Sequence, residues 1–498
     1  MSQLEKPMKI SKQLRMKAQE FLSSKKNSEC LAQIVNHLEC GADQLSCLLA
    51  LELIFTTLLK EREMFIEVVP LKPVEKTPEN QYKEWLKSAY EECYTKILQS
   101  LENTSHKIQV QGLSTAMNIL SQEGRFPLEV KGSLDNYVPL PKLKSLLMKI
   151  LSNKQINSQL INKYTEYLLF DDILFFTWKV LPSLTAKSNP NDVYIMNYLL
   201  LLEKLQVYQN SETNILCGTE EGSFFTFDET VTIKCLNKIW HCVMLWEHTP
   251  HTHKQLLIVM LEKVLPHLEK PLLLTDFLMD SLDVGGPVSL LALQGLFNLI
   301  QTHNLNYPNI FVKLYSMFEP EIFHTKYKAR LFFLSDLFLS STHLPENLVA
   351  AFAKRLARLA LIAPSEDIIV ICKFIGNLIL RHPGLKCLLN NPNCSAANTD
   401  PYIMEERDPL RSYAMSSSLW ELETLQHHVL PNVANAAKFI NAPLPRVEWD
   451  LGKMLDSTGD DIFDREVKKF SKLIVLQFEK PNGATIGKGD RVMQYWNL

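Results

Sequence analysis

The chain has 498 residues, of which 46% are hydrophobic and only 16 are glycine, and its 52 basic and 55 acidic residues give a net charge of -3. Such a length exceeds one compact core and predicts two or more domains or an extended array. The near-neutral charge excludes a protein whose whole surface neutralises nucleic-acid phosphates, so any RNA contact must be local. The ten scattered cysteines favour a reducing compartment, and the lack of long apolar runs argues against a membrane span.

The first 26 residues predict an amphipathic cationic helix, because Ile10, Leu14, Ala18 and Phe21 recur at helical spacing. Its candidate RNA-contacting cations are Lys9, Lys12, Arg15 and Lys17. Two interpretations stay open. The cations contact RNA or act as an import signal, or they form the solvated face of a helix that caps the array.

Apolar segments at 47–59, 110–120, 289–300 and 329–339 predict inner helices, and more amphipathic segments lie between them. This alternation favours an all-α, HEAT/armadillo-like α-α superhelix, a helical-repeat solenoid, over an irregular bundle. Breaks in the pattern predict an N-terminal array at 1–210, a linker at 211–228, a C-terminal array at 229–440 and an extension at 441–498. The extension ends in Tyr495-Trp496, an aromatic pair that we expect to dock on this chain or on a partner.

Sequence motifs for catalysis, cofactors and metals are missing. The nearest metal-like cluster is Cys235, His241 and Cys242, whose spacing also suits one face of a buried helix. The glycine-rich run at 483–489 has the wrong spacing for a phosphate-binding loop, and Gly489 replaces the Ser or Thr that would hold magnesium. We therefore expect no enzymatic activity, no cofactor and no small-molecule substrate.

Residues 344–364, LPENLVAAFAKRLARLALIAP, combine small residues with three cations, Lys354, Arg355 and Arg358. The alanines predict close approach of another helix. The cations then either surround that contact or bind phosphate, as local RNA contacts would require.

Residues 400–440 predict a helical hairpin. Met415, Leu419, Leu422, Leu425 and Val429 follow helical spacing after the start signal Asp408-Pro409, and a second start signal follows at Pro431. Core packing alone does not require Trp420, Glu421 or His428.

Four stretches, 285–320, 324–345, 377–389 and 400–437, together resemble the CBF family of nucleolar proteins. In the last stretch the matching residues are Asp400, Pro401, Tyr402, Pro409, Ser418 to Leu422, His428, Pro431 and Val433. Residues 344–364 are similar to the branch of that family that is tied to the small ribosomal subunit.

The resemblance implies a non-enzymatic scaffold of the small-subunit processome in the nucleolus, which forms a stable pair with nucleolar protein fourteen. It also implies contacts with other processome proteins, support of 18S rRNA maturation and support of 40S assembly. A DNA-binding transcription factor and an importin-like transport adaptor remain alternatives.

The signature residues have two interpretations. In the structural one, Trp420 fills a groove between helices, Glu421 accepts a hydrogen bond, His428 caps a helix end and Pro431 sets the turn. In the binding one, Trp420 and the loop at 400–411 anchor an extended partner segment.

Overall fold

The computed structural model describes residues 10–25, 27–41, 43–65, 77–128, 137–208, 214–218, 225–303, 307, 309–389, 399–456, 458–473 and 495. Lys9 and Trp496 lie outside these ranges. Every regular element within them is a helix, which confirms the all-α prediction. The chain forms two compact units, Met1–Leu299 and Ile300–Leu498.

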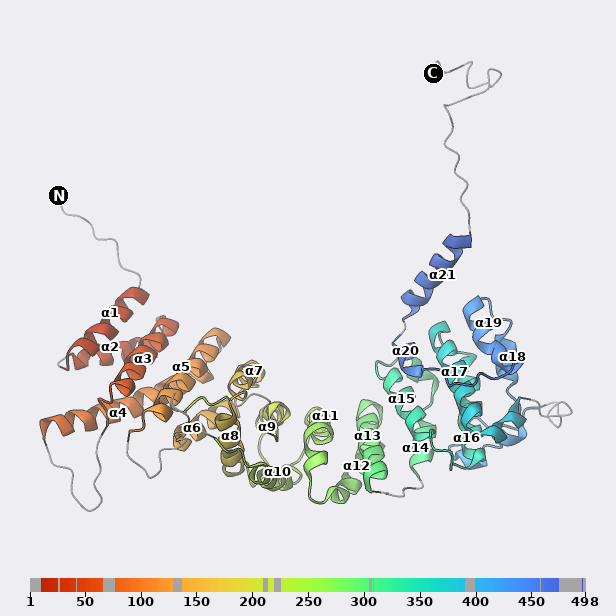
Figure 1. Ribbon diagram of the computed structural model, residues 1–498, viewed down its shortest axis with the longest axis horizontal. Helices are drawn as coiled ribbons and strands as arrows, with labels where there is room; N and C mark the ends of the chain where they lie inside the picture. The colour runs from red at the N-terminus through yellow and green to blue at the C-terminus, as the bar shows by residue number, and fades with distance from the viewer. Residues whose placement is uncertain are drawn as a thin grey trace. The chain divides into compact units, whose positions relative to one another are not determined.

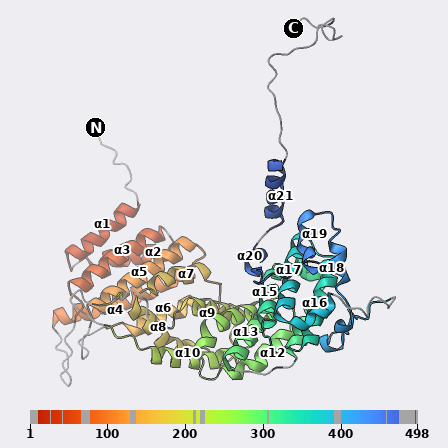
Figure 2. The ribbon, with the colours of Figure 1, turned by 45° about the vertical axis from the view of Figure 1, so that its right-hand side comes forward.

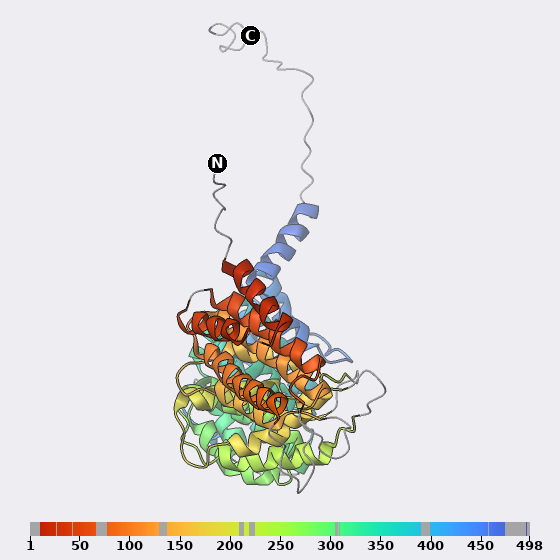
Figure 3. The ribbon, with the colours of Figure 1, turned by 90° about the vertical axis from the view of Figure 1, so that its left-hand side faces the viewer.

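The first unit is a succession of helices in chain order (Figure 1). The helices are α1 (Ile10–Ser23), α2 (Ser28–Glu39), α3 (Gln44–Lys60), α4 (Pro78–Gln99), α5 (His106–Arg125), α6 (Leu140–Ile150), α7 (Ser158–Tyr167), α8 (Asp171–Leu184), α9 (Asp192–Lys204), α10 (Glu229–Val243), α11 (Pro250–Val259), α12 (Thr275–Asp283) and α13 (Gly286–His303), whose last turn lies beyond Leu299. Figure 3 views this unit from the end where α1, α2 and α3 lie.

Helices two apart in the chain pack side by side in the first unit. The contacts α1–α3, α3–α5, α5–α7, α7–α9 and α9–α11 form one layer, and α4–α6, α6–α8 and α8–α10 form the other. This is the packing of stacked helix pairs, in which each pair covers the apolar faces of its neighbours. It confirms the helical-repeat prediction, and α3 and α5 are largely buried, as the sequence predicted.

Buried polar groups connect these layers. Glu123 on α5 accepts from the Tyr90 hydroxyl of α4 at 2.6 Å and from Lys142 Nζ of α6 at 2.7 Å, and all three side chains are buried. Asp172 on α8 accepts from the backbone N–H groups of Leu216 and Cys217. Residues 214–218, which lie inside the predicted linker, therefore pack on the first unit.

The second unit is built around α16. Its helices are α14 (Ile310–Ser316), α15 (Lys328–Phe338), α16 (Glu346–Ala360), α17 (Ser365–Arg381), α18 (Trp420–Leu425), α19 (Pro431–Ala437), α20 (Leu451–Leu455) and α21 (Gly459–Leu473). Short 3₁₀ turns include η6 (Pro383–Leu388), η8 (Pro409–Arg411) and η9 (Ala414–Ser416). Helix α16 contacts α17, α18 and these three turns, and Figure 2 shows α18 and α19 beside α16 and α17.

The predicted long helix from Pro409 to Val429 is wrong. The segment forms η8 and η9 and becomes α-helical only at Trp420, because Tyr413 takes the left-handed region at φ 55° and Ser417 is extended. Val429 is 93% exposed instead of sharing a buried face. The short turn before α19, with Pro431 in its first turn, agrees with the prediction.

Trp449 attaches the C-terminal extension to α17. Its backbone N–H donates to Asn377 Oδ1 at 2.9 Å, and Asn377 Nδ2 donates to the Trp449 carbonyl at 2.9 Å. The indole lies against Gly376, where an added Cβ would meet the ring at 2.4 Å. Of the pair Tyr495-Trp496, which is predicted to dock on this chain or on a partner, Tyr495 is exposed and Trp496 lies outside the described residues.

Candidate functional site

Asp400 is the centre of a hydrogen-bonded cluster on α16. Its Oδ1 accepts from Ser417 Oγ at 2.5 Å and from the Tyr402 backbone N–H at 3.1 Å. Its Oδ2 accepts from Trp420 Nε1 at 2.9 Å and from Arg358 at 2.7 Å, and lies 2.9 Å from Lys354 Nζ. One carboxylate thus joins α16 to the loop at 400–417 and to α18.

Glu421 is the second carboxylate of this cluster, and its side chain is fully buried. Its Oε1 lies 2.6 Å from Lys354 Nζ and 2.8 Å from Arg358 Nε, so both cations lie between Asp400 and Glu421. Lys354 also donates to the Ser418 carbonyl at 2.6 Å. The predicted acceptor Glu421 is therefore held by ion pairs with two cations of α16.

Arg355 forms a second attachment on the same helix. Its guanidinium donates to the carbonyls of Phe318 and Met404 at 2.8 and 2.9 Å and lies 4.5 Å from the centre of the Tyr315 ring. The Tyr315 and Tyr402 hydroxyls are hydrogen-bonded at 2.7 Å. Tyr402 of the signature is therefore an internal contact between the loop and α14.

The pKa values of the two carboxyl groups shift in opposite directions. Burial by itself would raise the pKa of Asp400, but hydrogen bonds from Ser417, Trp420 and Lys354 outweigh it and hold that pKa well below its usual range. Burial raises the pKa of Glu421, and Lys354 only partly opposes that effect. Asp400 is therefore the firmly ionised partner of the two cations.

The same loop exposes three large apolar side chains. Ile403, Leu410 and Tyr413 are 43%, 56% and 63% exposed, and the Ile403 N–H donates to the Ser412 carbonyl at 3.1 Å, which brings the two ends of the loop together. Trp420 lies over Arg358, with the guanidinium carbon 4.7 Å from the ring centre, and stays partly exposed. The cluster thus holds a small apolar surface, the 403–413 loop face, which we define by Ile403, Leu410 and Tyr413.

The remaining signature residues lie in or beside backbone turns. Pro409 is buried at the start of η8, where Asp408 accepts from the Leu410 N–H, and Pro401 is half-buried. His428 accepts from the Leu430 backbone N–H at 3.1 Å in the turn before α19. The imidazole thus caps the turn that Pro431 ends.

The candidate RNA-contacting residues separate into two groups. Lys354 and Arg355 are buried and engaged with groups of their own chain, so their charged ends are not available to a phosphate. Lys12 and Arg15 are exposed on α1, and Lys17 is half-buried beside them. Arg358 stays partly exposed while it pairs with Asp400 and Glu421.

Sequence reasoning missed the pairing of these cations with the signature acids. A usable signal was present, because Lys354 and Arg358 are one turn apart on a helix rich in alanine and leucine, and buried cations need anionic partners. Among the described residues, no group of three or more His, Cys, Asp or Glu side chains is arranged to hold a metal ion. None of the described helices combines the length and apolar character needed to cross a bilayer.

Two protein-family models match this chain, each over a different range of residues. A model of the CBF/Mak21 family matches residues 289–437, and a model described as "Nucleolar complex protein 4-like, TPR repeats" matches residues 7–189. TPR repeats are another class of stacked helix pairs, in agreement with the two layers of the first unit.

Relatives align over most of the chain. It is 37% identical to Nucleolar complex protein 4 homolog A of Xenopus laevis, over 96% of this chain and 94% of that protein. It is 35% identical to Nucleolar complex protein 4 homolog of Gallus gallus, over 89% and 91%, and 34% identical to that of Homo sapiens, over 89% of each. These matches confirm the resemblance to the CBF family and, within it, to nucleolar complex protein four. The chain therefore belongs to the nucleolar complex protein 4 family of CBF/Mak21 proteins, whose names place it in the nucleolus.

Proposed function

We propose that this chain is a non-enzymatic scaffold of the small-subunit processome that binds nucleolar protein fourteen and supports 18S rRNA maturation and 40S subunit assembly. The observation that carries the proposal is the charge cluster at Asp400. Asp400 accepts hydrogen bonds from Ser417 and Trp420 and pairs with the cations of α16, so the cluster fixes the shape of the loop.

The 403–413 loop face is the surface that we assign to the partner. Its apolar side chains are exposed, whereas the ionic contacts beneath it face α16. A rigid loop loses little conformational freedom on binding, and exposed aromatic and aliphatic side chains are typical anchors of protein interfaces. We place Trp420 at the border of this face. In the structural interpretation of the signature it covers Arg358, and in the binding interpretation it is part of the contact surface.

Affinity purification of the full chain from nucleolar extract tests the function. We expect nucleolar protein fourteen and precursors of the 40S subunit to be recovered together. Recovery of 60S precursors instead would assign the chain to a large-subunit pathway, and cargo release by a small GTPase would support the transport alternative.

Tyr413→Ser should lower the recovery of the partner about tenfold, as expected for loss of an interface anchor. Tyr167→Ser, in α7, is the control.

Direct RNA binding is proposed only for α1, where Lys12 and Arg15 are exposed. For single-stranded RNA, the logarithm of the binding constant falls linearly with the logarithm of the salt concentration. Replacing both residues by Gln should make this slope shallower by about 0.7 for each phosphate contact that is lost. The exposed Lys107 on α5 provides the control, as Lys107→Gln. An unchanged salt slope would leave α1 as a solvated helix at the end of the array.

Sequence-selective duplex DNA binding that persists at about 200 mM salt would instead support the transcription-factor alternative.

A further inference from the structure

Helix α21 has an apolar stripe that its own chain leaves exposed. Phe463, Val467 and Phe470 recur at spacings of four and three, so they share one side of the helix, and they are 68%, 47% and 51% exposed. Three large apolar side chains held together in water on one short helix are typical of a surface that another element covers.

The helix itself is well defined at its start. Thr458 and Asp461 form a reciprocal cap, in which the Thr458 N–H donates to Asp461 Oδ2 at 3.0 Å and the Asp461 N–H donates to Thr458 Oγ1 at 3.4 Å. Asp461 thus has a local role at the start of α21. Within the second unit α21 contacts α17, and Ile462, Ile369 and Val370 line the same groove.

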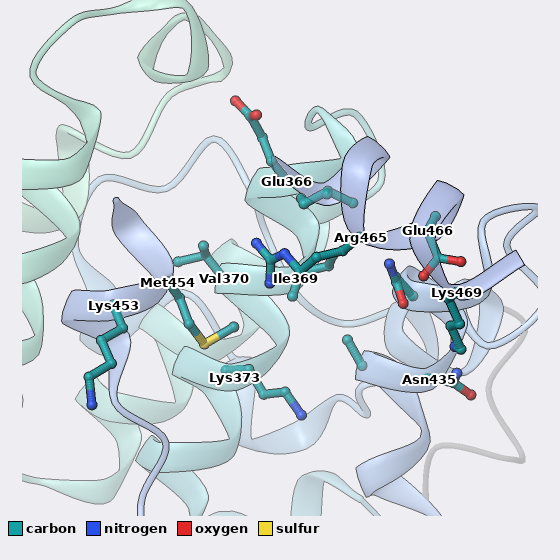
Figure 4. Close-up of a pocket in the computed structure, with 13 residues that line it drawn as sticks. Glu366, Ile369, Val370, Lys373, Asn435, Lys453, Met454, Arg465, Glu466 and Lys469 are labelled. Carbon is teal, nitrogen blue, oxygen red and sulfur yellow. The ribbon is translucent and has the colours of Figure 1, made fainter. Parts of the chain in front are cut away.

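Beside the stripe lies a groove of about 580 Å³ between α17, α19, α20 and α21 (Figure 4). Its charged lining consists of Lys373, Lys453, Arg465, Lys469, Glu366 and Glu466, so cations exceed acids by two. Glu366 is paired with Lys328, whose Nζ lies 2.9 Å from its Oε1, and Lys453 with Asp450 at 3.1 Å, so these two pairs leave the excess of cations unchanged. The groove is therefore electropositive.

Lys373 is the cation at the base of this groove. Its Nζ lies 4.4 Å from the centre of the Trp449 ring, and the side chain is half-buried between that ring and the groove. Burial lowers the pKa of Lys373, so a carboxylate entering the groove would gain from meeting a poorly solvated ammonium group.

We propose that α21 and this groove form a docking site for an acidic amphipathic helix of a partner protein. The apolar side of that helix covers Phe463, Val467 and Phe470, and its Asp or Glu side chains face Lys373 and Lys469. This inference rests on the proposed function, because it requires a stable protein partner. Helix-in-groove binding uses anchors at the spacing that α21 displays, and α21 is long enough to support about three turns of a partner helix.

The chain's own residues 474–498 are a poorer occupant. They contain Lys480, Lys488 and Arg491 against Glu479 and Asp490, so this segment carries a net positive charge, like the groove itself. A nucleic acid would leave the apolar stripe uncovered, because its phosphates and sugars present no apolar side chains to Phe463, Val467 and Phe470.

Photo-crosslinking in the complex of the full chain with co-expressed nucleolar protein fourteen tests the proposal. A benzoylphenylalanine at position 463 or 470 should crosslink to a partner peptide with helical apolar spacing and an excess of Asp and Glu. The same group at position 468, on the polar side of α21, should not. Crosslinking to residues 474–498 of the same chain, or to no partner peptide, would overturn the proposal.

Substitutions on α21, with partner binding as the readout, supply the second measurement. Lys469→Glu and Phe470→Ser should each abolish the crosslink from position 463 and weaken partner binding about tenfold. Lys468→Glu, which makes the same charge change outside the groove, should have little effect. If the partner fails to bind the unmodified chain, the proposed function is wrong. If the partner binds and all three variants bind equally, only this docking site is wrong.

Discussion

At the scale of single residues, Lys354 is the buried cation that links α16 to the signature acids. Its side chain is fully buried and its ammonium contacts Asp400, Glu421 and the Ser418 carbonyl. Such a group is stable only while its partners are present, and the cluster fixes geometry more than it adds net stability.

We predict that Lys354→Met lowers the free energy of unfolding of the second unit by about 3–5 kcal/mol, because it leaves two carboxylates with Arg358 as their one shared cation. Urea denaturation followed by circular dichroism measures the loss. The double variant Lys354→Met/Glu421→Gln should lose less than the single one, since it removes one of the uncompensated charges. Equal stability of Lys354→Met and the unmodified chain would contradict the assigned role.

The pKa of Asp400 gives a prediction with a defined sign. Because hydrogen bonds outweigh burial and hold this pKa below its unfolded value, ionised Asp400 contributes stability above about pH 4 that is lost as the pH falls further. Glu421 acts in the opposite direction, because burial raises its pKa. Asp400→Asn should therefore be less stable than the unmodified chain at pH 7, and the difference should narrow below about pH 4. A constant difference across that range would be inconsistent with this mechanism.

At the scale of elements, Trp449 decides where the C-terminal extension lies. The ring packs on Gly376, Lys373 lies over it, and Arg381 holds Glu448 next to it at 2.6 Å. A glycine inside α17 weakens the helix slightly, and here it provides the space for the indole.

We predict that Trp449→Ala costs about 2 kcal/mol and increases hydrogen exchange in residues 445–456, because the ring is only half-buried. Gly376→Ala should produce the same exchange pattern, since its Cβ would meet the ring at 2.4 Å. Gly452→Ala serves as the matched control, as its Cβ would meet only Asp450 Oδ1 at 3.3 Å. Unchanged exchange in Gly376→Ala would mean that the ring moves aside freely.

At the scale of the whole molecule, each unit leaves apolar side chains in contact with water. Besides the surfaces proposed above, the first unit exposes Leu245, Leu273 and Val284. Large exposed apolar areas are unfavourable for a protein that acts alone and are typical of a component of an assembly.

We predict that the chain purified alone aggregates at micromolar concentration and becomes monodisperse when co-expressed with nucleolar protein fourteen. Static light scattering and binding of a hydrophobic dye measure both states. A permanent pair of this kind should bury more than about 2,000 Å² of surface. A soluble monomer that binds no dye would count against the assembly role.

The amino-acid sequence determined the helical class, the inner helices and the family, because apolar spacing and signature residues are local properties of the chain. It failed from Pro409 to Val429, since helical spacing alone cannot reveal that Tyr413 takes a left-handed conformation. Only the tertiary structure decided that Lys354 and Arg358 bind Asp400 and Glu421, and that Trp449 lies on Gly376. These contacts join residues more than 40 positions apart, and their strength depends on burial, which exists only once the helices have packed.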